Sequence, residues 1–166
     1  MPGGDFGQTI FVMSTFVVIA LTMVFATFIY QEVKDPLNNS TFATNQSISA
    51  YNKFTTAWPL FDKASLFILI AMIAGVLISA FTIPTHPIYV IGNMLIMAVE
   101  VFVCFVLTNA YYGITSVDPA LLYIAQSTYP ITSYIVMHLP MFAIALSTLN
   151  CIIMFSHGRR TEQYGY

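Results

Sequence analysis

The 166 residues are 58% hydrophobic and 15% aromatic, and only 7% are charged, whereas roughly a quarter of a soluble domain is charged. A compact domain of this length has too small an interior for so many apolar side chains, so a water-soluble globule is excluded and lipid is the expected surrounding. The net charge of -2 and the lack of a basic run argue against a nucleic-acid partner.

Four apolar stretches are long enough to cross the hydrocarbon layer as helices, which takes about 20 residues. They cover about residues 9–30, 64–83, 88–111 and 131–156. Most charged residues fall between these stretches or in the tails, as the cost of burying a charge in lipid requires. We therefore predict an all-α integral membrane protein, a four-helix bundle formed as one transmembrane domain by residues 1–166. The basic residues divide two against three between the sides, which leaves the orientation open.

The first connection contains a run of apolar residues at helical spacing. This run predicts an interfacial helix over about residues 47–58, which Pro59 is expected to stop. Aromatic and basic side chains suit the headgroup layer as anchors; those in this region are Tyr51, Lys53, Trp58 and Lys63.

The second stretch carries small residues at every fourth position, a packing ridge that lets another helix approach closely. The ridge consists of Ala71, Gly75 and Ser79, and it suits a helix of the same chain or of a second copy. Pro84 and Pro87 follow, and neither fits a helix interior. We therefore expect a tight hairpin that makes the second and third spans antiparallel neighbours.

Glu100 is the charged residue that lies within a predicted span, and it is the strongest functional candidate. Asn93, Glu100, Cys104 and Thr108 recur at helical spacing, so one face carries nearly all the polar groups of the third span. We expect this face to point inward. It either bonds the helix to its neighbours, which is the favoured interpretation, or conducts protons or ions.

The last connection and the fourth span add three features. Asp118 followed by Pro119 predicts a helix start, and a short interfacial helix over about residues 118–127 should close the membrane surface. His138 is the candidate partner of Glu100, but antiparallel packing places it about one turn away, and a core histidine already satisfied locally is the commoner case. Pro140 leaves the carbonyl four residues earlier without its helical donor, so we expect a kink and a bond from His138 or a water.

No pattern of residues predicts enzyme chemistry. The three histidines lie at different depths and form no HxxH or ExxH pattern, so no metal or haem site is expected. The two cysteines form no CxxC motif. We therefore predict a protein that is not an enzyme, with no catalytic residue, metal or cofactor.

The turn Phe81-Thr82-Ile83-Pro84-Thr85-His86-Pro87-Ile88 between two apolar helices resembles a segment of small polytopic membrane proteins of tailless, membrane-containing icosahedral viruses. The resemblance implies a structural protein of the lipid vesicle beneath a capsid, with capsid proteins as partners. It transfers no catalytic residues.

Three functions remain, and the first is favoured. The chain is a structural or assembly component of a virion inner membrane or of a larger membrane complex, with the bilayer, other membrane or capsid proteins and a second copy as its partners. Alternatively, it is a proton- or ion-conducting subunit that uses Glu100, or a holin-like protein that permeabilises a host cell membrane.

Overall fold

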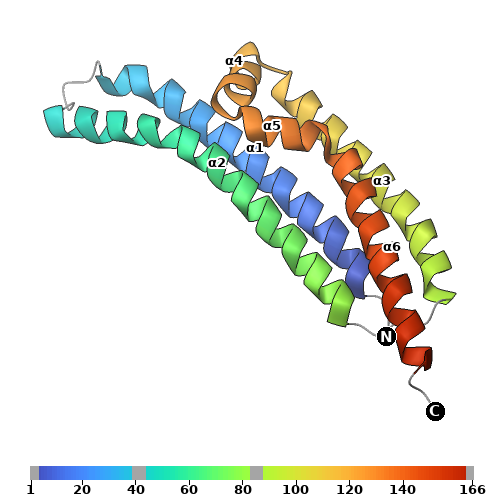
Figure 1. Ribbon diagram of the computed structural model, residues 1–166. Helices are drawn as coiled ribbons and strands as arrows, with labels where there is room; N and C mark the ends of the chain where they lie inside the picture. The colour runs from blue at the N-terminus through green and yellow to red at the C-terminus, as the bar shows by residue number, and fades with distance from the viewer. Residues whose placement is uncertain (1–3, 39–43, 83–87, 164–166) are drawn as a thin grey trace.

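The computed structural model describes residues 4–38, 44–82 and 88–163, and within these ranges the chain is helical with no strand. Figure 1 shows the helices in their order along the chain. They are α1 (Gly4–Asn38), α2 (Asn45–Thr82), α3 (Ile88–Thr115), α4 (Pro119–Tyr123), the π-helical turn η1 (Ile124–Thr128), α5 (Pro130–Met137) and α6 (Leu139–Gln163).

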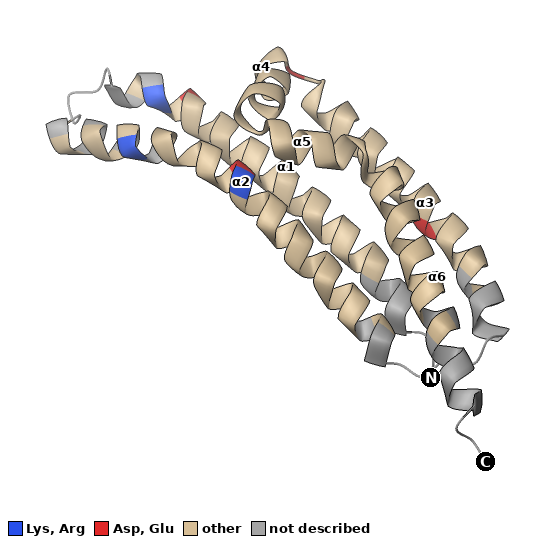
Figure 2. Ribbon diagram, viewed as in Figure 1, with Lys and Arg blue, Asp and Glu red and all other residues tan. Residues whose placement is uncertain are grey.

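Three helical segments are long and apolar enough to cross a membrane: Thr9–Lys34, Thr55–Ile78 and Met94–Thr115. The pair α5 and α6 passes the same test when its two helices are counted together, and they meet at an angle of 64°, as in a broken span or a re-entrant loop. Large apolar side chains cover the outside of the helices, among them Phe11, Phe67 and Leu95, each about 70% exposed. Figure 2 shows that the helices are uncharged over most of their length. The fold is compatible with an integral membrane protein.

The four long helices lie lengthwise beside one another (Figure 1). α3 packs mainly against α6 and α1, and α2 packs against α1 and α6. Their shared core is apolar and is centred on Met13, Phe16, Leu69, Val136 and Leu139.

The expected pairing of the second and third spans is not found in the described residues, where α1 and α6 lie between α2 and α3 (Figure 1). The physical reason lies in α3, because its buried face, with Glu100, Cys104 and Tyr111, is turned to α6 and its neighbours. The two prolines of the expected hairpin are at positions 84 and 87, outside the described residues.

The expected end of an interfacial helix at Pro59 is wrong, because α2 runs through Pro59 without a break. Pro59 removes the backbone donor that would bond the carbonyl of Thr55, and a helix tolerates the loss of one such bond where the packing around it holds the helix in place. The hydroxyls of Thr55 and Thr56 donate to a different carbonyl, that of Asn52 one turn earlier, at 2.8 and 2.9 Å. Residues 45–58 are therefore the first turns of a 38-residue helix, which curves along its length (Figure 1).

α4 begins where Asp118 and Pro119 predicted a helix start. The side chain of Asp118 accepts a hydrogen bond from the backbone of Ala120 at 2.7 Å, and Pro119 occupies the first turn, where its missing donor is no loss. The buried side chains of Leu121 and Ile124 then pack with Val24 of α1 in a second apolar cluster. The short helix thus rests on the other helices.

Candidate functional site

The helix is interrupted at His138, between α5 and α6, and polar groups of neighbouring helices gather around this interruption and around α5. α5 ends at Met137, and α6 begins at Leu139. Pro140 cannot donate to the carbonyl of Val136, and Thr108 of α3 supplies the missing hydrogen through its hydroxyl at 2.9 Å. A hydroxyl from a neighbouring helix therefore satisfies the group that the proline leaves open.

His138 is satisfied locally, as the favoured interpretation of the sequence expected, and takes neither of the other two roles. Its Nδ1 atom lies 2.8 Å from the carbonyl oxygen of Tyr134, and its ring lies 4.2 Å from the Tyr134 ring, centre to centre. The expectation that His138 satisfies the carbonyl of Val136 is wrong, because Thr108 does so. In the described part of the chain, His138 and Glu100 form no hydrogen bond with each other.

The N-terminus of α5 is capped by a carboxylate from another helix. Asp62 of α2 is only 3% exposed, and its Oδ1 accepts from the backbone and the hydroxyl of Thr132 at 2.8 and 2.7 Å. Its Oδ2 accepts from the backbone of Ile131 at 3.1 Å. These are amides of the first turn, which have no partner within their own helix and carry the positive end of its dipole. Asp62, expected in a connection, is thus buried within α2.

Two further side chains connect α1 and α3 to the same segment. The Tyr129 hydroxyl lies 2.6 Å from the Thr27 oxygen, and Tyr129 is the donor because Thr27 donates to its own helix. The hydroxyl of Tyr111 on α3 lies 2.8 Å from the hydroxyl of Ser133. We call these pairs, together with Asp62 and Thr132, the polar clamp. It holds residues 129–133 to α1, α2 and α3.

Burial governs the chemistry of the clamp tyrosine that lies outside the candidate spans. Removal from water raises the pKa of Tyr129, and the nearby Asp62 raises it further, while the hydrogen bond with Thr27 lowers it in part. Tyr129 is therefore neutral at physiological pH and keeps the proton that it donates to Thr27.

Glu100 lies in the interface between α3 and α6 and is 2% exposed. Its Oε2 accepts a short hydrogen bond from the hydroxyl of Ser147 on α6. Its Oε1 has no hydrogen-bond partner among the described residues, and neither has Oδ1 of Asn150, which is 6% exposed and lies three residues beyond Ser147 on the same helix. Cys104, one turn from Glu100, is 1% exposed.

The polar face predicted on the third span is brought together only in part. Glu100 and Cys104 are buried, and Thr108 contacts α5. The side chain of Asn93 lies outside the described residues. The groups that meet this face, Ser147 and the backbone of Val136, come from the fourth stretch.

The packing ridge of α2 does not seat a helix of the same chain. Ala71 and Gly75 are exposed, and a Cβ atom added to Gly75 would meet nothing within 4 Å. The side chain of Ser79 lies outside the described residues. A second copy therefore stays as the predicted occupant of this ridge.

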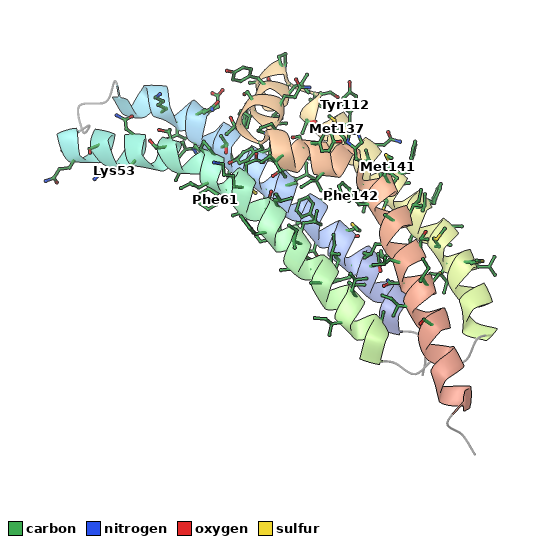
Figure 3. All side chains as sticks on the ribbon, in the orientation of Figure 1. Lys53, Phe61, Tyr112, Met137, Met141 and Phe142 are labelled. Atoms are coloured by element: carbon green, nitrogen blue, oxygen red, sulfur yellow. The ribbon has the colours of Figure 1, made fainter. Side chains whose placement is uncertain are left out.

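The predicted anchors of the first connection differ in their surroundings. Lys53 and Lys63 are exposed, and Lys53 extends away from the helices in Figure 3. Trp58 is half-buried, and its ring packs edge-on against the ring of Tyr129 at 6.4 Å. The side chain of Tyr51 lies outside the described residues. Trp58 thus contributes to packing next to the clamp.

A cavity of about 250 Å³ lies at the bend between α5 and α6. Figure 3 shows Met141 and Phe142, two of its lining residues, on α6 beside the bend. The other lining residues are Tyr134, His138 and Ala145. Of these, His138 carries a titratable nitrogen that already contacts a backbone carbonyl. In the described part of the chain, no three His, Cys, Asp or Glu side chains are grouped as metal ligands.

Sequence reasoning missed the clamp and the α6 partners of Glu100. One signal was available, since Ser147 and Asn150 are polar residues three positions apart within an apolar stretch and so share a helix face. The role of Asp62 had no comparable signal, because it depends on where a distant helix begins.

Comparison of the chain with known protein families, with curated proteins and with solved structures finds no match in any of the three. The geometry of its own residues is therefore the basis for any statement about function.

Proposed function

We propose that the chain is a non-enzymatic structural protein of a membrane. In this proposal α1, α2, α3 and the bent pair α5–α6 cross the bilayer as a four-helix bundle, and the segment from Asp118 to Thr128 lies at its surface. The observation that carries the proposal is the use of buried polar groups: the polar clamp joins α1, α2 and α3 to residues 129–133. Groups engaged in this way stabilise a helix arrangement in lipid.

The partners follow from the outer surface and from the resemblance. The exterior of the long helices is apolar and suits lipid or other membrane helices. The turn at residues 81–88 resembles viral membrane proteins, which favours a virion inner membrane as the location and capsid proteins as partners. A larger membrane complex of another kind, or a host cell membrane, is the remaining possibility within the same function.

The assembly part of the proposal is tested by crosslinking the full chain in phosphatidylcholine vesicles and by determining its mass after mild detergent extraction. We expect assemblies larger than one chain. Gly75→Leu, which fills the exposed ridge of α2, should reduce crosslinking between copies. Gly113→Leu is the matched control, since this glycine of α3 also has open space around its Cβ position. A chain that stays monomeric and has no stoichiometric partner would contradict the proposal.

A conducting subunit is the second candidate, favoured by the unpartnered Oε1 of Glu100. Vesicles that contain the protein and a pH-sensitive dye distinguish the two functions. A structural protein leaves the proton permeability at the level of empty vesicles and retains a small trapped dye. Proton flux that Glu100→Gln abolishes would replace the proposal by conduction, and dye release would replace it by a holin-like activity.

A further inference from the structure

We propose that Glu100, Ser147 and Asn150 form a proton-binding site within the membrane, in which Glu100 is a neutral acid and donates its hydrogen to the side-chain oxygen of Asn150. The site lies between α3 and α6, away from the polar clamp. It adds a ligand, one proton, to a protein whose proposed function requires none.

One hydrogen-bond donor is missing among the polar groups around Glu100. Ser147 donates to Oε2, while Oε1 of Glu100 and Oδ1 of Asn150 are buried acceptors without a partner among the described residues. An ionised carboxylate is only an acceptor, so its Oε1 could form no hydrogen bond with Oδ1 of Asn150, which is also an acceptor, with the amide oriented as in the structure. A proton on Oε1 turns that atom into a donor, and the two unpaired acceptors then satisfy each other. Both positions suit this pairing, because the Glu100 side chain leans toward the start of α3, where the antiparallel α6 places the turn after Ser147.

Among the described residues, no positive charge lies close to Glu100. Cys104 is the titratable neighbour on α3, one turn away. In the described residues, α6 contributes Ser147 and Asn150, and α1 contributes apolar core side chains such as Met13. Burying a carboxylate without a positive partner is so costly that such groups keep a proton or bind a cation.

The donor set favours a proton over a metal cation. Hard cations such as Mg²⁺ and Ca²⁺ take six or more oxygen ligands. The three side chains offer four oxygen atoms at most, and the Ser147 hydroxyl points its hydrogen at Glu100. A single hydrogen completes the arrangement, whereas a cation would require ligands that these side chains do not supply.

Labelling with dicyclohexylcarbodiimide tests the proposal on the full chain in phosphatidylcholine vesicles. This apolar reagent takes the acid proton on nitrogen while the carboxyl oxygen adds to its central carbon, and the adduct rearranges to a stable N-acylurea that mass spectrometry locates. We expect Glu100 to be labelled at pH 7 at least about tenfold more than Glu32, an exposed glutamate of α1. Labelling of Glu100 should fall at alkaline pH in one titration step.

Two variants separate a proton site from mere burial. Ser147→Ala removes a donor to the carboxyl group, so the midpoint of the labelling titration should move to higher pH by about one unit, a tenfold gain in proton affinity. Glu100→Gln keeps a permanent donor near Asn150. At pH 7 its free energy of unfolding should therefore equal that of the unchanged protein. Above the pH midpoint of the labelling titration, the unchanged protein should lose stability and the variant should not.

Two results would overturn the inference. The first is a Glu100 that is labelled no more than Glu32 at pH 7 in protein whose helical circular dichroism is intact. The second is labelling of Glu100 that added Na⁺ or K⁺ suppresses at constant pH, since the occupant would then be a cation.

Discussion

Replacing Asp62 by Asn tests whether the polar clamp stabilises the fold. Asp62 accepts three hydrogen bonds, two of them from the first-turn amides of α5. Asn keeps one acceptor oxygen but places an NH₂ group where an oxygen faced the backbone of Ile131. Hydrogen bonds to a charged group contribute about 1.5–3 kcal/mol each, and a buried donor left unpaired costs about 1–3 kcal/mol. We expect Asp62→Asn to lower the free energy of unfolding by about 3 kcal/mol.

The matched control is Asp118→Asn. Asp118 also caps a helix, through one bond at 2.7 Å to Ala120, but it is more exposed, and Asn caps a helix as well as Asp. The control should cost less than about 0.5 kcal/mol. Reversible unfolding by sodium dodecyl sulfate in bicelles measures both. The single tryptophan, Trp58, reports the opening directly, because its ring lies 6.4 Å from that of Tyr129 next to α5. Equal stabilities of the two variants would refute the reasoning.

Two further predictions concern the break and the clamp tyrosine. Thr108→Val should lower the free energy of unfolding by about 1–2 kcal/mol, because it leaves the carbonyl of Val136 without a donor; in a Pro140→Ala background, where a backbone donor returns, the same change should cost about 1 kcal/mol less in a double-mutant cycle. Burial raises the pKa of Tyr129 above its usual value of about 10, so the folded state keeps the proton longer than the unfolded state. The stability that Tyr129 contributes is complete below about pH 10 and is lost as the pH rises further. Tyr129→Phe should therefore reduce the decrease in the free energy of unfolding with pH, measured by unfolding curves between about pH 8 and 11. An unchanged dependence of this free energy on pH would disprove the prediction.

Sequence patterns identified the apolar helices but placed some of their ends wrongly. Long apolar runs identify a membrane helix because each one satisfies its own backbone, whatever lies beside it. A proline is more ambiguous: Pro59 lies within an intact helix, whereas Pro140 adjoins a break of 64°. The difference arises from the surroundings, since Thr108 of α3 supplies a donor at the second site.

The candidate sites were predictable to the extent that they depend on one helix. Helical spacing grouped Glu100, Cys104 and Thr108 on one face of α3. The spacing of Ser147 and Asn150 indicated a polar face on the fourth span, but which residue of that span meets Glu100 depends on how α6 packs against α3 beyond the bend at His138. The sequence around Asp62 does not indicate that this residue is buried, because the amides that bind its carboxylate lie 69 and 70 residues further along the chain.

The length of α2 fixes a distance. Its 38 residues measure about 57 Å at 1.5 Å per residue, whereas the hydrocarbon layer is about 30 Å thick. With Thr55–Ile78 in that layer, the turns from Asn45 to Phe54 extend beyond it by up to about 15 Å, alongside the end of α1 (Figure 1). Because α2 curves along its length (Figure 1), this is the greatest height at which its first turns can hold side chains such as Lys53 outside the hydrocarbon.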